Sequence, residues 1–250
     1  MTPELTAAAC RRSVLELGGA FLESPWSRDR ARQLGLSGLA FHIAGRGGAL
    51  GDVRADTVAA ALGFIAPEAV NDGWDAARRI TSPADVAAQN LAECCRWGAG
   101  HLDAFGGVER LVELTERLVL AADPAGMPLF AAWRAMPVPA GGPGSHAAIL
   151  LHLLSEHRCG AHLLAVRAAG LTPLAAIIAG PDGEAGAVKF GWRPPYPPVG
   201  PLVRRRAWAE AVTDRIAGQA YEVLEVAERA DLVRLLDGAS AAARALPVTE

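Results

Sequence analysis

Lysine is almost absent from this chain: Lys189 is the only one, and the remaining basic side chains are arginines. Acidic side chains outnumber basic ones by 27 to 24, so the net charge at neutral pH is −3. Proteins that attract nucleic acid or anionic membranes through their overall field carry an excess of positive charge. The composition therefore argues against both partners.

We also expect no segment that carries the protein to or through a membrane. The N-terminal stretch MTPELTAAACRRSVLELGG holds an acid, Glu4, and no basic region ahead of an apolar run, so we expect no signal peptide. No uncharged apolar run approaches the roughly 20 residues that a bilayer requires. The cysteines (Cys10, Cys94, Cys95 and Cys159) show no CxxC spacing. We expect reduced thiols in a cytoplasmic protein.

Several motifs of well-known active sites are missing. The chain contains no GxSxG, HExxH, GxGxxG or P-loop sequence. The glycine-rich stretch HIAGRGGALGD (42–52) follows no predicted strand, so we interpret it as a turn between helices that holds Arg46. The basic segment VRRRAWAE (203–210) is soon followed by further acids and fits a solvated face better than a phosphate site.

What the sequence does contain is helical periodicity. Apolar residues recur at spacings of three and four over 54–70, 82–102, 106–122, 145–169 and 204–246. The best extended candidate is the short piece AGAVKFGW (185–192). The Pro/Gly-rich segment MPVPAGGPGS (136–145) separates two halves, and five prolines in 191–201 predict an extended connection. We predict an all-α fold of about ten helices with little or no sheet, in two lobes, 1–136 and 145–250.

Two segments resemble each other within the chain. RQLGLSGLAFHIAG (32–45) and RAAGLTPLAAIIAG (167–180) share an arginine, Gly-Leu, Leu-Ala and Ile-Ala-Gly at matching positions. Each predicts a helix that ends at a glycine, followed by a helix that starts from Ser or Thr. Coincidence in an alanine-rich chain explains the match as well as a true repeat does. A true repeat implies two similar lobes with a ligand pocket between them.

Chemistry-bearing side chains are concentrated in one predicted helix, 145–169. Four of the six histidines lie within 17 residues there, from His146 to His162. Three interpretations remain open: a core histidine at 157 beside a solvated face, a Glu-His-Arg polar site in an apolar pocket, or metal or haem ligation through His152, Glu156 and His157 or His162. We expect His157 to face the pocket and His152 to face the rim or solvent.

The polar-site interpretation assigns a role to each residue. Glu156 and His157 would act as acid and base, His162 would orient or share the proton, and Arg158 would hold an anionic group. We also assign Arg46, reaching in from the glycine-rich turn, and Trp192 to substrate binding. No metal ligand and no cofactor are predicted, although metal or haem binding stays an alternative.

The order of several segments is similar to a known family. GLSGLAFHIAGRGGALG, LGFIAPEAV, SEHRCGAHLLAVRAAGL, FGW and AVTDRIAGQAYEVL resemble an actinobacterial family of uncharacterised helical proteins, usually labelled as a helix-turn-helix family. The resemblance covers most of the chain. Its most specific part looks like E-H-R-G-D-x-H, in which Cys159 and Gly160 here replace the Gly and Asp. The resemblance implies a helix-turn-helix module after Trp192, where five prolines leave no room for two helices.

The predicted function is small-molecule binding by a helical protein, as an enzyme of actinobacterial specialised metabolism with its Glu/His/Arg site between the lobes. The alternatives are a ligand-sensing transcriptional regulator and a haem or metal protein. We expect a small-molecule partner and neither DNA nor a membrane. The oligomeric state is left open between a monomer and a homodimer.

Overall fold

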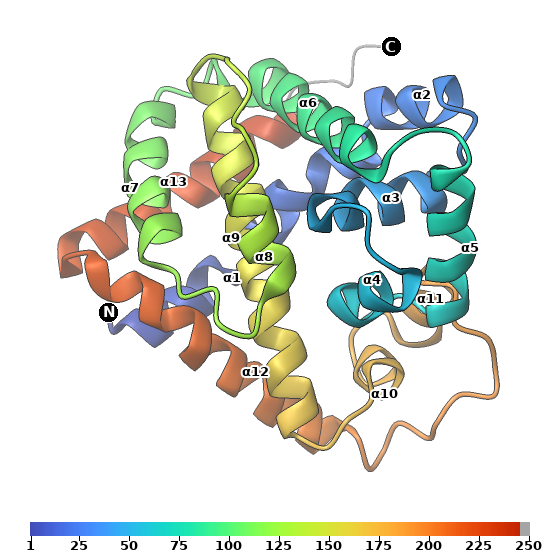
Figure 1. Ribbon diagram of the computed structural model, residues 1–250. Helices are drawn as coiled ribbons and strands as arrows, with labels where there is room; N and C mark the ends of the chain where they lie inside the picture. The colour runs from blue at the N-terminus through green and yellow to red at the C-terminus, as the bar shows by residue number, and fades with distance from the viewer. Residues whose placement is uncertain (246–250) are drawn as a thin grey trace.

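The computed structural model describes residues 1–245, and the prediction of an all-α fold is confirmed over this range (Figure 1). These residues form thirteen α-helices and three short 3-10 helices, with no strand. Four of the thirteen are short: α4, α8, α10 and α11 have six to eight residues each. The elements are α1 (Pro3–Gly19), η1 (Ala20–Glu23), α2 (Pro25–Gln33), α3 (Gly38–Gly47), η2 (Gly48–Leu50), α4 (Ala55–Leu62), α5 (Pro67–Arg78), α6 (Pro83–Leu102), α7 (Val108–Ala121), α8 (Pro128–Arg134), α9 (Pro143–Ala168), α10 (Pro173–Ile178), α11 (Gly183–Lys189), α12 (Val203–Gly218), η3 (Gln219–Val223) and α13 (Val226–Ala245).

The longest helix, α9, runs through the middle of the molecule (Figure 1). It packs against α1, α6, α7 and α12. The consecutive residues Leu150 and Leu151 are both buried, as are Leu153 and Leu154, so apolar side chains surround this part of the helix. A helix that is apolar on all sides belongs in a core. The candidate site residues 156–162 therefore lie on a central helix.

Glycines bring two neighbours unusually close to α9. A Cβ atom built on Gly98 of α6 would lie 2.3 Å from the carbonyl oxygen of Gly144. A Cβ on Gly18 of α1 would lie 2.5 Å from the carbonyl oxygen of Leu151. Real side chains do not approach a backbone oxygen so closely, so only glycine permits these helix–helix contacts.

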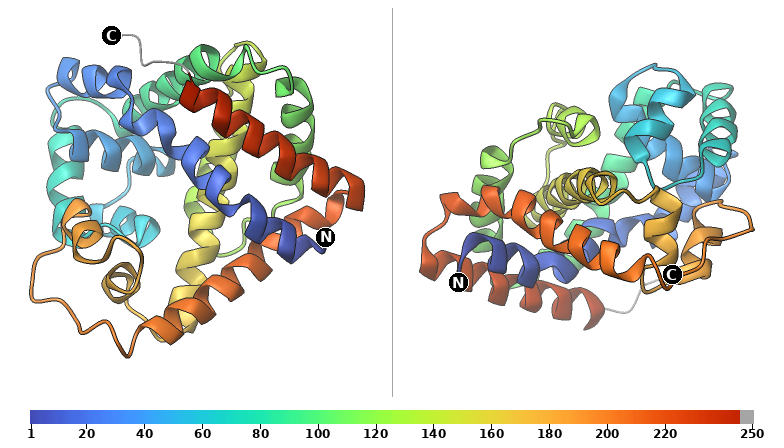
Figure 2. Two further views of the ribbon diagram at one scale, coloured as in Figure 1. Left: turned by 180° about the vertical axis from the view of Figure 1, so that it is seen from behind. Right: turned by 90° about the horizontal axis from the view of Figure 1, so that it is seen from below.

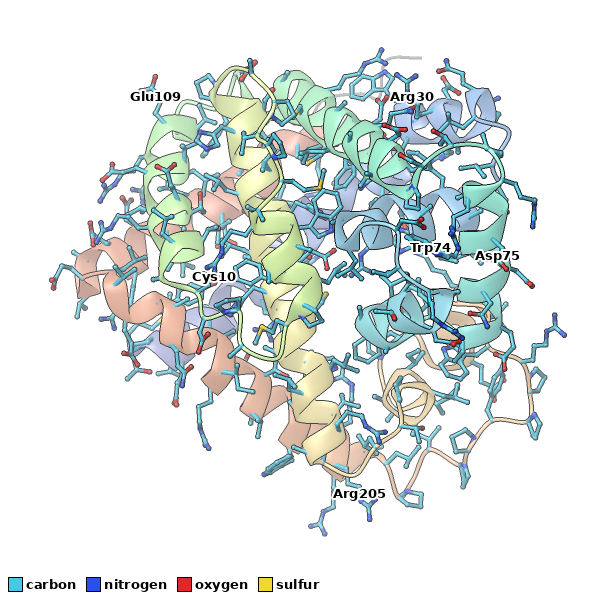
Figure 3. All side chains as sticks on the ribbon, in the orientation of Figure 1. Cys10, Arg30, Trp74, Asp75, Glu109 and Arg205 are labelled. Carbon is cyan, nitrogen blue, oxygen red and sulfur yellow. The ribbon has the colours of Figure 1, made fainter. Side chains whose placement is uncertain are left out.

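The main hydrophobic core draws on residues from both sides of the 137–144 segment, including Trp74, Phe130 and Leu151. Trp74 is fully buried and donates from Nε1 to the oxygen of Val53, whereas the next residue, Asp75, points outward (Figure 3). The N-terminal helix α1 packs against α12 and α13 from the other end of the chain (Figure 2, left). The core thus continues across the proposed boundary, and the division into two lobes stays a prediction.

The two similar segments adopt the same local structure. Gly35 and Gly170 have φ angles of 70° and 68°, which terminate α2 and α9. The amide of the following leucine bonds back to the last turn in each case, Leu36 to Ala31 at 2.9 Å and Leu171 to Val166 at 3.0 Å. Ser37 and Thr172 then cap α3 and α10 through side-chain oxygens, each 3.1 Å from a backbone nitrogen. The predicted glycine stop and Ser/Thr start are confirmed at both places.

The extended piece predicted for 185–192 is wrong. Residues 183–189 form α11, and Gly191 then turns the chain at a φ of 79°. The alanines of this segment favour helix, and Glu184 in the first turn suits the positive end of the helix dipole. From 190 to 202 the chain forms no helix, so the proline-rich connection is as predicted.

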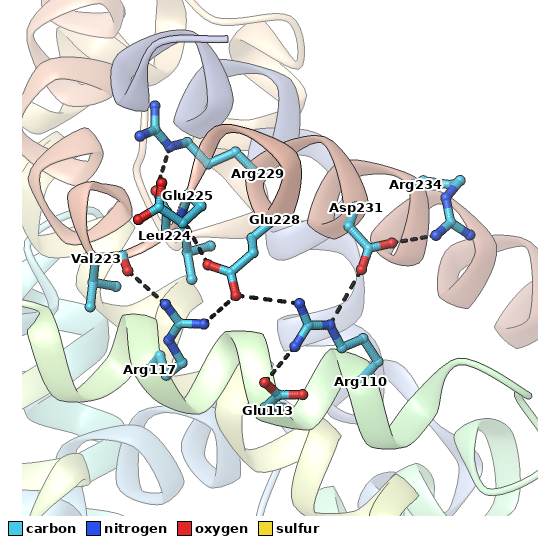
Figure 4. Close-up of polar contacts among 10 residues, drawn as sticks. All are labelled: Arg110, Glu113, Arg117, Val223, Leu224, Glu225, Glu228, Arg229, Asp231 and Arg234. Carbon is cyan, nitrogen blue, oxygen red and sulfur yellow. Dashed lines mark hydrogen bonds and ion pairs between the residues drawn. The ribbon is translucent and has the colours of Figure 1, made fainter.

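An ion-pair network joins α7 to the start of α13 (Figure 4). Arg110 contacts Glu113, Glu228 and Asp231, while Arg117 contacts Glu228 and the carbonyl oxygen of Val223. A hydrogen bond from Arg117 lowers the pKa of Glu228 to about 2. Pairs near the surface contribute little individually, so the network links α7 to α13 with a modest effect on stability.

Candidate functional site

A cavity of about 290 Å³ lies between α9 and elements from the first half of the chain. Arg46 and Leu50 contribute from α3 and η2, and Glu156 from α9. Its volume is near the lower end of the range typical of small-molecule sites. The wall is mainly apolar, and the other lining residues are Thr57, Ala60, Ala61, Leu62, Gly126, Met127, Pro128, Leu129, Phe130, Cys159, Gly160 and Leu163.

Arg46 and Glu156 form a bidentate ion pair in this wall. Arg46 Nε lies 2.7 Å from Glu156 Oε1, and Nη2 lies 2.8 Å from Oε2. The two side chains are 14% and 5% exposed. Burial alone raises the pKa of Glu156, but the charge and hydrogen bonds of Arg46 outweigh it and hold that pKa below its usual value. Glu156 is therefore ionised at neutral pH.

The pair leaves one end of the guanidinium without a partner. Within residues 1–245, Arg46 Nη1 makes no hydrogen bond, although Nε and Nη2 do. Arg46 lines the cavity, and Nη1 is the guanidinium nitrogen that has no partner among these residues. Since Glu156 already compensates the positive charge, the site presents a hydrogen-bond donor with little net charge.

Local structure explains why Arg46 is held in place. Residues 42–47, interpreted from the sequence as part of a turn, belong to α3, and Arg46 sits in its last turn, where a cation suits the helix dipole. The glycines on either side permit close packing: a Cβ on Gly45 would lie 2.9 Å from Asn90, and one on Gly47 would lie 2.5 Å from Val58. Trp133 Nε1 also donates to the carbonyl oxygen of Arg46, at 3.2 Å.

A histidine precedes each member of the pair by one helical turn. His42 lies on α3 before Arg46, and His152 lies on α9 before Glu156. Desolvation lowers the pKa of His42 to about 3 and also lowers that of His152. Both rings are therefore neutral beside the ion pair.

The expectation that His152 faces the rim or solvent is wrong. His152 is 2% exposed and packs edge-on against Phe21 and Trp133, with ring centroids 5.4 and 4.9 Å away. This part of α9 has no solvent-facing side, because α1, α6 and α8 surround it. Amphipathic spacing alone did not reveal that enclosure.

His157 is buried but does not line the cavity. It is 4% exposed and packs against Phe130 with ring centroids 4.9 Å apart. Burial lowers the pKa of His157 to about 4, so the ring is neutral at pH 7. Phe130 lines the cavity and also packs against His157, so the histidine is connected to the cavity only through this ring.

Arg158 and His162 face α12 instead of the cavity. Arg158 Nη2 lies 2.7 Å from Asp214 Oδ1 and 3.5 Å from Glu210 Oε2, and its side chain is 6% exposed. His162 Nδ1 lies 2.9 Å from Thr213 Oγ1, whose own proton is directed to the oxygen of Ala209. His162 Nδ1 is therefore the donor of that bond. Burial lowers the pKa of His162 to about 4.

These α12 partners were missed by sequence reasoning. Glu210, Thr213 and Asp214 occur at i, i+3 and i+4, a spacing that puts them on one helix face. That face could have been matched with Arg158 and His162, which are themselves four residues apart. The arrangement ties α9 to α12.

Trp192 joins two loops. Its Nε1 donates to the carbonyl oxygen of Phe64 at 2.8 Å, and the ring of Phe64 stacks on His162 with centroids 5.5 Å apart. Trp192 does not line the cavity. Of the six predicted site residues, only Arg46 and Glu156 line the cavity, while Arg158 and His162 share a face toward α12.

Cys159, Gly160 and Leu163 line the cavity and were not predicted as site residues. With Glu156 they occupy positions i, i+3, i+4 and i+7 of α9, so one helix face forms this wall. Burial raises the pKa of Cys159, which keeps the thiol uncharged. A Cβ on Gly160 would lie 2.8 Å from Met127, so the absence of a side chain here permits contact with the loop before α8.

The donors considered for a metal do not converge. His152, His157 and His162 have different neighbours, and Glu156 is engaged by Arg46. Over the described part of the chain, no three or more His, Cys, Asp or Glu side chains are grouped so as to hold a metal ion. In the same range no helix is long and apolar enough to cross a bilayer.

Comparison with known proteins gives one result. Residues 7–195 match the model of a family described as the helix-turn-helix family, which is more than half of the chain. No curated protein and no solved structure matches. The match includes α3, α4, α8 and α9 and therefore every residue that lines the cavity. This chain belongs to the helix-turn-helix family.

Proposed function

We propose that this protein binds a small, mainly apolar molecule in the cavity beside Arg46 and Glu156. The observation that carries the proposal is the buried bidentate pair in an otherwise apolar wall, with Arg46 Nη1 left to donate. Apolar pockets with few convergent polar groups are the usual form of a ligand site. The ligand would place a neutral acceptor, such as a carbonyl oxygen, against Nη1.

The charge of the site favours a neutral ligand over an anion. Glu156 Oε1 and Oε2 already occupy the guanidinium edge formed by Nε and Nη2. A carboxylate ligand would have to compete with Glu156 in a buried position, where an uncompensated carboxylate is costly. A carbonyl group adds a hydrogen bond without that cost.

A more specific proposal than ligand binding is an enzymatic role for Glu156, His157 and His162 in the specialised metabolism of an actinobacterium. Glu156 is the only one of the three in the cavity wall, and its pairing with Arg46 suits binding better than proton transfer. Four unpaired cysteines agree with a cytoplasmic location. A biosynthetic gene cluster around the coding sequence would support this role.

Two probes of nearly equal shape test the binding proposal. Acetophenone carries a carbonyl oxygen, and α-methylstyrene carries a methylene group in its place. We expect the wild-type protein to bind acetophenone about 10- to 150-fold more tightly, since a hydrogen bond to a charged donor contributes roughly 1.5–3 kcal/mol. The double variant Arg46→Met with Glu156→Met should keep the apolar site and lose this preference.

The location is tested by filling the cavity. Ala61→Trp places an indole in it and should abolish binding of both probes, measured by titration calorimetry or ligand-observed NMR. Asp56→Trp adds the same ring to an exposed position of α4 and should leave binding unchanged. Equal binding to wild type and Ala61→Trp would place the probes elsewhere and end the proposal.

Family membership supports a second candidate, a ligand-sensing transcriptional regulator. We nevertheless expect no DNA binding, because the net charge is −3 and residues 190–202 form no helix where the family's DNA-reading module is expected. A gel shift at low salt with the protein's own promoter region tests this. A sequence-specific shift would establish the regulator.

A further inference from the structure

A second cavity, of about 400 Å³, lies between α1, η1, α2, α6 and the end of α13. It shares no lining residue with the Arg46 cavity. Two of its elements, α1 and α13, lie in front in the rear view (Figure 2, left), whereas α4 and α8 of the first cavity lie in front in Figure 1. The molecule therefore has a separate candidate site on another face.

Aromatic rings form one side of this second cavity. The ring of His101 stacks on Trp97, with centroids 5.0 Å apart and planes 14° from parallel. Trp26 meets His101 edge-on at 5.8 Å, and Arg96 covers the Trp26 ring at 4.7 Å from its centroid. Trp97 and His101 are 5% and 8% exposed, so the rings are fixed by packing. These rings give the cavity an aromatic, mainly apolar wall.

The hydrogen bonding of His101 determines which ring nitrogen can accept. Nδ1 lies 2.9 Å from the carbonyl oxygen of Trp97, which can only accept, so Nδ1 carries the proton. In the neutral ring Nε2 is then an acceptor. No residue from 1 to 245 donates to it, and His101 is among the residues that line the cavity. A more than nine-tenths buried ring thus offers one free acceptor in an apolar site.

The acidic groups at the edge of the cavity are already paired. Glu16 accepts from Arg244 at 2.6 Å, and Glu23 accepts from Lys189 at 2.7 Å. Arg28 donates to the carbonyl oxygen of Glu23 at 2.6 Å. Both acids at the edge are therefore compensated, so the edge offers no free carboxylate to a cationic ligand.

We propose that this cavity binds neutral, planar aromatic molecules that carry one N–H or O–H donor. The flat face packs beside Trp26 and Trp97, and the donor bonds to His101 Nε2. The site is independent of the Arg46 cavity and of its proposed ligand.

Indole and 1-methylindole, which differ in the single N–H group, are the probes. Titration calorimetry gives Kd for both with wild type and with His101→Phe, which keeps an aromatic ring and removes the acceptor. We expect the ratio of the two Kd values to shift by roughly 2- to 10-fold between the proteins, the size of one neutral hydrogen bond. The first-cavity variant Ala61→Trp should bind both probes as wild type does.

A second measurement needs no variant of His101. In the wild-type protein with ¹⁵N-labelled histidine, indole should shift the Nε2 resonance of His101, and 1-methylindole should leave it nearly unchanged. Equal shifts with both probes, an unchanged Kd ratio in His101→Phe, or no indole binding up to its solubility limit would each overturn the proposal. Loss of binding in Ala61→Trp alone would assign the probes to the first cavity and would also overturn it.

Discussion

The Arg46–Glu156 pair gives a sharp prediction about stability. Glu156→Met leaves a buried guanidinium without its carboxylate, and Arg46→Met leaves a buried carboxylate without its guanidinium. Breaking a buried pair on one side costs about 3–5 kcal/mol. We expect the lower end for Glu156→Met, because Arg46 is 14% exposed and lines a cavity. Removing both charges should cost less than about 1 kcal/mol, since apolar residues of similar size often replace such pairs without loss.

Urea denaturation followed by circular dichroism measures these free energies of unfolding. In a domain of this size 1 kcal/mol corresponds to about 2–4 °C, so each single variant should lower Tm by roughly 6–20 °C. Arg54→Met is the control, because its pair with Asp56 is 86% and 73% exposed, and it should cost less than about 0.5 kcal/mol. Single variants that cost under about 1 kcal/mol, or a double variant that costs their sum, would refute the account of the pair as a coupled buried unit.

Two further predictions concern the central helix. Gly98→Ala should destabilise the protein by about 1–3 kcal/mol, because the new Cβ would lie 2.3 Å from the carbonyl oxygen of Gly144. Gly19→Ala is the control: the space around Gly19 is open, so this change should be neutral or stabilising. Thermal melts of the two variants compare them directly. His157 and His162 have folded-state pKa values of about 4, below the 6.5 of an unfolded histidine, so the unfolded chain binds more protons as the pH falls. The free energy of unfolding should therefore fall as the pH drops from 6.5 to 4. At pH 5 each histidine should account for a loss of about 2 kcal/mol relative to pH values above 6.5. His157→Phe should reduce this pH dependence of the urea midpoint, and an unchanged dependence would contradict the buried neutral ring.

Sequence reasoning succeeded where a local rule decides the structure. The apolar spacing of three and four predicts the helices, and the Gly-Leu-Ser and Gly-Leu-Thr segments predict the stop at Gly35 and Gly170 and the start at Ser37 and Thr172. These features depend on φ angles and capping within a few residues. The prediction of a short extended piece at 185–192 failed because the local preferences there are weak and easily overridden.

The candidate site was harder, because it depends on which helices meet. Arg46 and Glu156 are 110 residues apart, and both were selected from the sequence. His157 and Arg158 follow Glu156 on α9 but point away from the cavity. The reason is that several helices enclose α9, and each of its faces has a different partner. A helical wheel shows which residues share a face; it does not show which helix covers that face. The sequence shows that Cys159 and Leu163 share a helix face with Glu156. It does not show that this face lines a cavity.

The two walls of the Arg46 cavity differ in how freely evolution can change them. One wall is formed by α9, which α1 and α6 contact closely at Gly18 and Gly98, where only glycine fits. Substitutions that move α9 would break these contacts. The opposite wall includes α4, eight residues long, whose Thr57 and Ala60 are exposed and face few neighbours. Substitutions there alter the shape of the cavity without disturbing the core. Divergence in ligand preference among relatives should therefore concentrate in α4, while the glycines of the frame persist.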